Sequence, residues 1–306
     1  MMRARVSLSL AILALAAAPS TADEPPLSGG GEVADLPSDA RPLTDLTLGN
    51  LFSEGWSDPW QRESRETPSM ALLRVLTSHL AKRFRVDYVG TDVANNPKFD
   101  ATELTNVIMG YALNRRLMVE ITGTYQWNLP PSGIGVNGAA GALLARFQLV
   151  DTATQSYTFQ TKLVTPNKSL GQTQTSLQYG LAGWQDMHAL LPALGRFGLY
   201  GSFQYESLLG PRKAGAATND VSYDISLAET WTSPATPVFG NFTTFLEAYA
   251  TTLLDGATAG KTTVSLTPGV RFWFLPQSSL TVGVDVPVSH APTFHKAARV
   301  TFIQNF

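Results

Sequence analysis

The stretch Arg116–Leu129, RLMVEITGTYQWNL, alternates between apolar and polar residues. A period of two predicts a β-strand, because successive side chains of a strand point to opposite faces of its sheet. The apolar face carries Leu117, Val119, Ile121, Tyr125, Trp127 and Leu129, and the polar face carries Arg116, Glu120, Thr122, Thr124, Gln126 and Asn128. A sheet of such strands needs apolar surroundings on one side and polar surroundings on the other.

The same period extends from Lys82 to Phe306. It predicts twelve strands, each near the roughly 9–11 residues that a tilted membrane strand requires. Short turns alternate with longer loops rich in glycine, asparagine and proline, although two connections on the short side are longer. The expected strands lie near 82–92, 103–113, 116–128, 137–149, 156–165, 173–185, 196–208, 220–232, 241–253, 262–274, 279–287 and 296–306.

The even number of strands predicts an all-β fold whose last strand closes on the first. An open sheet would leave two unpaired edges, and a sandwich would leave one face of each strand in water. The polar faces hold mainly Thr, Ser, Gln and Gly rather than the Lys and Glu of a wet exterior. We therefore expect a closed antiparallel transmembrane β-barrel of about twelve strands over residues 70–306, in the bacterial outer membrane with both chain ends in the periplasm. Aromatic residues near strand ends fit the two membrane interfaces: Tyr88, Tyr111, Trp127, Tyr157, Tyr205, Tyr223 and Trp231.

The composition agrees with a membrane protein and excludes several kinds of site. Of the 306 residues, 44% are apolar and 15% are charged, against roughly 25% charged residues in soluble domains. The 22 basic and 24 acidic residues give no sign of a nucleic-acid surface. Because the chain has no cysteine, it has no disulfide, no thiolate metal site, no cysteine nucleophile and no lipid-anchored cysteine. We expect no cofactor.

The N-terminus has the pattern of a secretory signal peptide. Two arginines precede an apolar run from Val6 to Ala18, which is shorter than the roughly 20 residues of a membrane helix. Small residues at Ser20 and Ala22 predict cleavage after Ala22, so that residues 1–22 are the signal peptide of a Gram-negative exported protein.

Residues 23–69 are expected to form an irregular periplasmic segment. Its second half contains Leu51, Phe52, Trp56 and Trp60, too many apolar side chains for a solvated tether. Residues 70–80 fit either a short amphipathic helix capped by Ser69 or the start of the first strand. Two arrangements remain open: residues 51–80 partly occlude the periplasmic mouth, or residues 70–80 extend the first strand and the tryptophans lie at the membrane interface.

Two residues conflict with simple alternation. Pro268 lies inside an expected strand, and because proline cannot donate to the ladder we expect a bulge or kink at Pro268–Gly269. Glu229 shares the expected lipid-facing side with Ile225 and Leu227, so we expect a register shift or a position near a rim.

Charged residues on the polar faces are the candidate lumen-facing site. Such charges favour one of two roles: a paired network that braces the wall, or a constriction that orients a polar or zwitterionic solute. The set is of mixed sign and contains Arg83, Arg85, Asp87, Arg116, Glu120, Arg146, Lys162, Glu206, Asp224, Glu247, Arg271, Asp285 and Arg299.

The chain ends in RVTFIQNF, residues 299–306. A terminal Phe preceded by alternating apolar residues is similar to the assembly signal of bacterial outer-membrane barrels, with Val300, Phe302 and Phe306 in the matching positions. Gln304 departs from that signal. The similarity implies that the partners are the barrel-assembly machinery and outer-membrane lipids.

Several strand motifs resemble the family named for the meta-cleavage pathway of phenol degradation, a group of outer-membrane transporters. They are SLTPGVRFWFLPQSSLTVGVDVPVS, LEAYA and the entry TPSMALLRV with RFRVDY, and the match covers roughly residues 65–306. The resemblance implies passive uptake of small solutes, with aromatic or hydrophobic compounds among the candidates.

Two other function classes remain open. A structural barrel would have a lumen blocked by side chains or by residues 23–80. A surface lipase would need serine, histidine and an orienting residue together, yet Ser289 and His290 are only neighbours in the sequence, and His290 and His295 share a loop at a spacing that is weak for a metal. We therefore expect a channel without catalytic residues.

Overall fold

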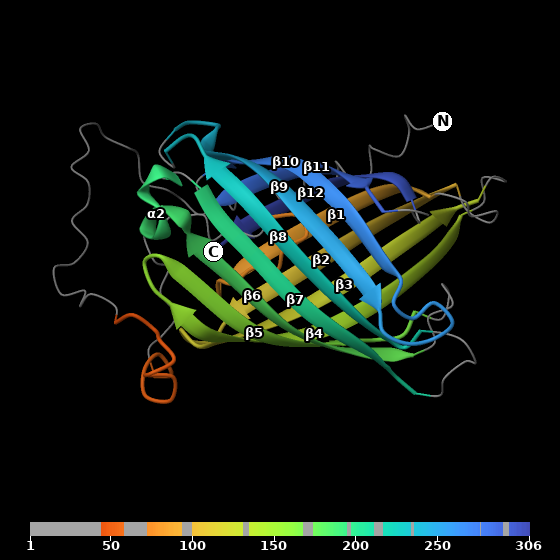
Figure 1. The fold of residues 1–306 in the computed structure, drawn as a ribbon, viewed down its shortest axis with the longest axis horizontal. Helices are drawn as coiled ribbons and strands as arrows, with labels where there is room; N and C mark the ends of the chain where they lie inside the picture. The colour runs from red at the N-terminus through yellow and green to blue at the C-terminus, as the bar shows by residue number, and fades with distance from the viewer. Residues whose placement is uncertain are drawn as a thin grey trace, which may run out of the picture. The chain divides into compact units, whose positions relative to one another are not determined.

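The protein is described by a computed structural model over residues 44–57, 72–93, 100–130, 135–167, 174–194, 197–210, 217–233, 236–275, 277–289 and 294–306. Within the compact unit Leu46–Phe306, twelve antiparallel strands form one closed barrel (Figure 1), which confirms the expected fold class. Every strand end lies within two residues of its expected position. The strands are β1 Arg83–Val93, β2 Ala101–Ala112, β3 Leu117–Leu129, β4 Val136–Asp151, β5 Gln155–Val164, β6 Thr175–Asp186, β7 Phe197–Leu209, β8 Asn219–Thr230, β9 Gly240–Leu253, β10 Thr262–Leu275, β11 Ser278–Pro287 and β12 Phe294–Asn305.

The barrel closes where β1 pairs with β12. Their register runs from Arg83 opposite Asn305 to Thr91 opposite Ala297, and the Phe306 backbone N–H donates to the Lys82 carbonyl at 3.1 Å. The start of β1 and the end of β12 therefore lie at one rim, called here the end rim; the opposite one is the loop rim. Helix α2 (Met187–Leu190) and the 3-10 turn η3 (Pro192–Leu194) join β6 to β7 at the end rim (Figure 1). In the described part of the chain, no helix has the length and apolar character needed to span a membrane.

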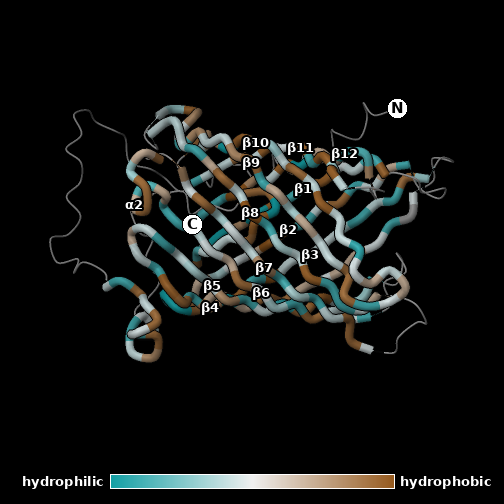
Figure 2. Tube along the Cα trace, in the orientation of Figure 1, coloured by the Kyte–Doolittle hydropathy of each residue, from teal (hydrophilic) through white to brown (hydrophobic). Residues whose placement is uncertain are grey.

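Hydrophobic and hydrophilic residues succeed one another along the strands (Figure 2), and the two faces of the wall differ in polarity. The outer face presents exposed aliphatic and aromatic side chains, and the inner face buries polar and charged ones. A closed wall that is apolar outside and polar inside fits a lipid surrounding. Exposed outer residues include Met109, Tyr111, Ile121, Tyr125, Leu143, Phe159, Leu181, Phe203, Ile225, Leu246 and Val284, and buried inner ones include Glu120, Thr122, Arg146, Thr158, Gln160, Glu247, Thr267, Arg271, Asp285 and Thr301.

The bulge expected at Pro268–Gly269 is absent. The register between β10 and β11 is the same before and after the proline, from Leu266 opposite Val286 to Gly269 opposite Gly283. Strand β10 keeps its register with both neighbours through Pro268, and a hydrogen bond of 2.6 Å from the Thr267 hydroxyl to the Asp285 carboxylate joins β10 to β11 beside the proline.

Glu229 lies near a rim, one of the two positions expected for it. It is the penultimate residue of β8 and pairs with Phe197, the first residue of β7, at the end rim. A carboxylate there can reach water, so its place on the outward face costs little.

Residues 46–57 pack against the barrel at the end rim. Leu46 pairs with Asp151 at the end of β4 as an isolated antiparallel β-bridge, in which each backbone N–H donates to the carbonyl of the other residue. The centroid of the Trp56 ring lies 5.3 Å from that of the outward-facing Phe147 ring. Arg116, in the turn before β3, donates to carbonyl groups of this segment at Thr47, Asn50 and Glu54. Trp60 lies outside the described residues.

Residues 72–82, called here the inner segment, run inside the barrel. They are neither the amphipathic helix nor the strand extension that the sequence suggested: Leu72–Lys82 are irregular, and β1 begins at Arg83. The cap residue expected for the helix, Ser69, lies outside the described residues. The segment cannot form a helix where it lies, because its backbone N–H groups donate to side chains of the wall instead of to one another.

Candidate functional site

The inner segment connects two opposite parts of the barrel wall. Its first residues contact β9 and β11, and its next residues contact β4 and β5. In the closed strand order these two groups of strands lie on different sides of the barrel. The segment therefore occupies the lumen, and its contacts define the candidate functional site.

One side of the site is an acidic cluster of Asp224, Glu247 and Asp285, on β8, β9 and β11. The Glu247 carboxylate accepts the backbone N–H groups of Leu73, Arg74 and Val75 at 3.2–3.3 Å. Glu247 and Asp285 are fully buried. Carboxylates in such a place are stable only when hydrogen bonds or cations satisfy their oxygens.

One of the two cations at the acidic cluster comes from the inner segment itself. The Arg74 guanidinium donates to Asp285 Oδ2 from Nε at 3.1 Å and from Nη2 at 2.5 Å, and it lies 4.2 Å from the centre of the Tyr249 ring. Arg299 donates to the same Oδ2 atom at 2.6 Å. Ion pairing and cation–π attraction together hold the Arg74 side chain in place.

The opposite side of the site is a basic cluster of Arg83, Arg85 and Arg146 with Asp87 and Glu120, on β1, β3 and β4. Arg83 donates to Glu120 at 2.8 Å, and Arg146 approaches the other oxygen of the same carboxylate at 3.5 Å. Arg85 donates to Asp87 at 2.7 Å, and Asp87 also accepts from the Thr301 hydroxyl. The cluster contains one more guanidinium than carboxylates.

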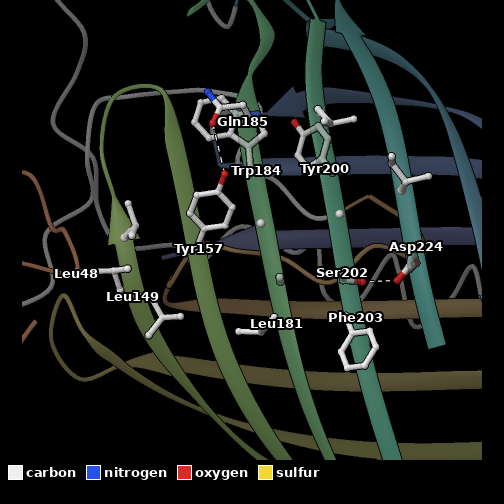
Figure 3. A pocket seen from close by; sticks show the side chains of 16 residues that line it. Leu48, Leu149, Tyr157, Leu181, Trp184, Gln185, Tyr200, Ser202, Phe203 and Asp224 are labelled. Atoms are coloured by element: carbon white, nitrogen blue, oxygen red, sulfur yellow. Dashed lines mark hydrogen bonds between the residues drawn. The ribbon is translucent and has the colours of Figure 1, made fainter. Parts of the chain in front are cut away.

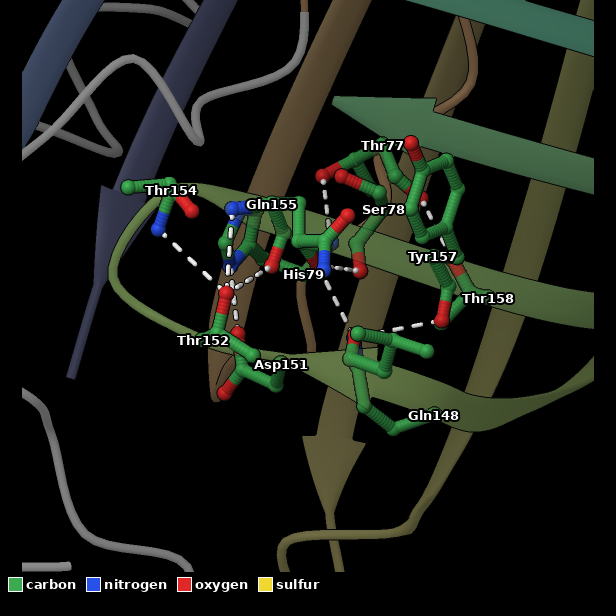
Figure 4. Close-up of polar contacts among 12 residues, drawn as sticks. Thr77, Ser78, His79, Gln148, Asp151, Thr152, Thr154, Gln155, Tyr157 and Thr158 are labelled. Carbon is green, nitrogen blue, oxygen red and sulfur yellow. Dashed lines mark hydrogen bonds and ion pairs between the residues drawn. The ribbon is translucent and has the colours of Figure 1, made fainter. Parts of the chain in front are cut away.

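Backbone carbonyls of the inner segment face the basic side, and Figure 4 shows part of these contacts. The Thr77 carbonyl accepts from Arg146 at 3.2 Å and from the Thr158 hydroxyl at 3.5 Å. The Ser78 carbonyl accepts from the Ser156 hydroxyl at 2.8 Å. The same segment thus offers a guanidinium to the acidic cluster and carbonyl oxygens to the basic one.

A hydrophobic cluster of the wall, called here the apolar seat, packs against the first part of the inner segment. Leu72, Leu73 and Val75 are buried in a cluster with the inward-facing Trp184, Tyr200, Ala228 and Phe245. Two paired glycines, Gly269 and Gly283, make room for it: a Cβ on Gly269 would lie 2.3 Å from Phe245, and one on Gly283 would lie 2.5 Å from Leu73. Glycine at these two positions permits the close approach of side chains to the wall.

The remaining candidate residues lie around this site. Lys162 and Glu206 occupy the inner face of β5 and β7 toward the loop rim, and Arg271 is buried on β10, where it donates to Thr243 at 3.1 Å. Arg116 differs from the others, because its guanidinium binds the carbonyls of residues 46–57 and of β4 at the end rim. Its contacts make it an anchor for that segment.

Sequence reasoning missed Arg74 and the aromatic seat. Trp184, Tyr200 and Phe245 fall in phase with the polar residues of their strands, such as Ser176, Ser202 and Glu247. Aromatic side chains in the polar phase of a barrel strand are a usable signal, because that phase faces the lumen. No comparable pattern indicates Arg74, since the helix-like apolar spacing of residues 70–80 says nothing about where the Arg74 side chain binds.

Several buried polar atoms of the inner face have no hydrogen-bond partner among the described residues. They include Arg83 Nε, Arg146 Nε, Gln160 Oε1, Asp224 Oδ1, Ser176 Oγ, Ser226 Oγ and Thr281 Oγ1. An unsatisfied buried polar atom costs about 1–3 kcal/mol. The interior therefore favours contact with water or with a polar ligand.

A separate groove of about 570 Å³ lies along β5–β8, with Leu48 of the end-rim segment at its edge (Figure 3). Most of its lining side chains, such as Tyr157, Leu181 and Phe203, belong to the outward face. The groove therefore lies mainly on the outward surface, although Trp184, Tyr200 and Asp224 of the lumen site also line it.

The histidines do not form a metal site in the described part of the chain, where no group of three or more metal-ligating side chains occurs. His79 lies in the inner segment and His188 in helix α2. His290, which the sequence paired with Ser289 or with His295, lies outside the described residues.

No family model and no curated protein matches the chain. Among solved structures, the COG4313 outer membrane channel from Pseudomonas putida F1 matches 81% of this chain and 100% of that chain, with a TM-score of 0.51 and 13% identity. The KdgM porin matches 73% of this chain and 99% of that chain, with a TM-score of 0.47 and 8% identity. The CymD monoaromatic hydrocarbon channel matches 74% of this chain and 89% of that chain, with a TM-score of 0.43 and 7% identity. At these identities the likeness concerns the fold, that of an outer-membrane barrel. The resemblance to the phenol-pathway family stays a prediction.

Proposed function

We propose that the chain is a passive outer-membrane channel for small solutes and that the inner segment holds it in a closed state. The observation that carries the proposal is how this segment is held. Its contacts are hydrogen bonds and ion pairs to wall side chains and one apolar seat, with no secondary structure of its own. A segment held in this way can leave the lumen without any change in the barrel strands.

The solute class follows from the inner face. The wall toward the loop rim is lined by polar side chains such as Asn106, Gln126, Lys162, Glu206 and Ser222, which supports small polar solutes. Aromatic or hydrophobic solutes remain the expectation from the family resemblance. The lumen could offer them the ring surfaces of Trp184, Tyr200 and Phe245, but only after the inner segment has left.

A structural barrel without an open pore is the second candidate. The fit of Leu73 over Gly283, with Phe245 over Gly269 beside it, favours this reading, because such packing is typical of a permanent core. Conductance measurements separate the two candidates.

The test is a cross-link that locks the inner segment. We expect cysteines at Leu73 and Gly283 to form a disulfide, because Leu73 Cδ1 lies 2.5 Å from the place of a Cβ at Gly283, and the natural chain has no cysteine to interfere. In planar bilayers the oxidised Leu73→Cys, Gly283→Cys variant should carry no current. Reduction should restore the openings of the natural protein.

The matched control is Leu73→Cys with Gly123→Cys, because Gly123 lies on the outward face of β3 with no atom within 4 Å of an added Cβ. It should conduct equally under oxidising and reducing conditions. Absence of current both in the natural protein and in Arg74→Ala, which loses the ion pair of the inner segment, would contradict the channel and favour the structural barrel if both proteins insert and fold.

A further inference from the structure

The contacts of the inner segment have the polarity of a zwitterion. A guanidinium is held at the acidic cluster, and partly negative carbonyl oxygens are held at Arg146. These two contacts belong to Arg74 and Thr77, which are three residues apart, so their Cα atoms are separated by at most roughly 10 Å, and the Arg74 side chain extends further to reach Asp285. A solute that makes both contacts therefore needs a carboxylate at one end and a cation at the end of a long side chain, as a basic amino acid has.

Both halves of the site are left with unmet charge when the inner segment departs. The acidic cluster keeps three carboxyl groups, Asp224, Glu247 and Asp285, against the one guanidinium of Arg299. On the other side, Arg146 loses the Thr77 carbonyl, and its Nε atom already has no partner although the side chain is only 5% exposed. A buried carboxyl excess attracts a cation, and a buried guanidinium with free N–H groups attracts a carboxylate.

We infer that the inner segment occupies a binding site for a basic amino acid, with Arg74 standing where the guanidinium of the solute binds. The inference rests on the proposed channel function and names its solute class. The solute cation binds Asp285 and lies against the Tyr249 ring, as Arg74 does. Its carboxylate binds Arg146. Solute and inner segment exclude each other, so that binding of the solute opens the lumen.

The experiment measures binding of L-arginine to the purified, folded full-length protein by titration calorimetry. Only the fraction of protein whose site is free can bind the solute, and the apparent affinity falls in proportion to that fraction. If the inner segment occupies the site in nine molecules of ten or more, Arg74→Ala and Arg74→Gln should each bind L-arginine about tenfold or more tightly than the natural protein. Agmatine, which lacks the carboxylate, and L-citrulline, which has a neutral urea in place of the guanidinium, should bind both variants more weakly than L-arginine.

Two further variants separate the halves of the site. Adding Asp285→Asn to Arg74→Ala should abolish the preference for L-arginine over L-citrulline, and adding Arg146→Gln should abolish the preference over agmatine. Lys261→Ala, at an exposed position of the loop rim, should bind like the natural protein. Heat-modifiable mobility on gels measures whether the barrel of each variant is folded.

Two results would overturn the inference: L-arginine binding to both Arg74 variants that is no tighter than to the natural protein, or equal binding of L-arginine and L-citrulline. The potassium chloride conductance of the same samples tests the channel separately. If the protein carries current but does not bind L-arginine, the inference is wrong and the channel stands. If it binds L-arginine but no variant carries current, the channel is wrong and the binding site stands.

Discussion

Ile225 and Glu229 lie on the same outward face of β8 but at different depths. Ile225 is 55% exposed in the middle of the strand, whereas Glu229 is the penultimate residue at the end rim. If lipid surrounds the outer face, a charge is costly at the first position and cheap at the second. We expect Ile225→Lys to destabilise the folded barrel by about 2–4 kcal/mol and Glu229→Lys by about 0–1 kcal/mol.

Urea unfolding in lipid vesicles measures both variants. The two substitutions introduce the same side chain on the same strand, so Glu229→Lys is the matched control for the intrinsic cost of lysine. Equal free energies of unfolding for the two variants would show that Ile225 does not face the hydrocarbon layer.

At the scale of the element, the inner segment contains one group that titrates near neutral pH. Burial, and secondarily the neighbouring Arg83 charge, lower the pKa of His79 to about 4, against an ordinary value near 6.5. The Asp151 carboxylate, 3.8 Å from His79 Nδ1, favours the charged form but does not outweigh these effects. The seated segment therefore holds His79 neutral.

The sign of the pH dependence follows from the lowered pKa. The seated state is fully favoured above pH 6.5, and it loses stability as the pH falls from 6.5 toward 4, because the released segment binds a proton that the seated one does not. We expect the open probability in planar bilayers to rise over this window. His79→Gln should remove the rise, and any dependence left in that variant belongs to the carboxyl groups of the lumen. An identical pH profile for the two proteins would exclude His79.

At the scale of the whole molecule, closure depends on the last strand. β12 joins β1 to β11 and so completes the ring. The Phe306 side chain is 57% exposed and therefore adds little packing to the folded barrel. If Phe306, with Val300 and Phe302, forms the assembly signal expected from the sequence, its loss should impair insertion far more than stability.

We expect Phe306→Ala, or residues appended after Phe306, to leave unfolded chains in the periplasm. Heat-modifiable mobility on gels measures the folded fraction in cells. The control is Val288→Ala, which removes a similarly exposed apolar side chain beyond the end of β11. Normal assembly of both Phe306 variants would mean that the barrel-assembly machinery does not recognise this residue.

The sequence alone determined the barrel, because the period of two is a local property of each strand. Alternation along the chain predicted all twelve strands, their faces and the closure of β12 on β1, since hydrogen bonding along a closed ring leaves only one antiparallel order for consecutive strands joined by short connections. It also gave a position near a rim as one of two expectations for Glu229. These features depend on neighbours in the chain or on adjacent strands.

Only the tertiary structure decided what fills the lumen. The apolar spacing of residues 70–80 suggested a helix, but residues 72–82 form no regular element, and several of their backbone groups bind side chains far away in the sequence, such as Glu247 for Arg74 or Arg146 for Thr77. The unbroken register of β10 at Pro268, where a Thr267–Asp285 hydrogen bond joins the strands, was likewise not visible in the local pattern. Contacts of this kind arise from the closed ring of the barrel, which brings together side chains that no local pattern relates.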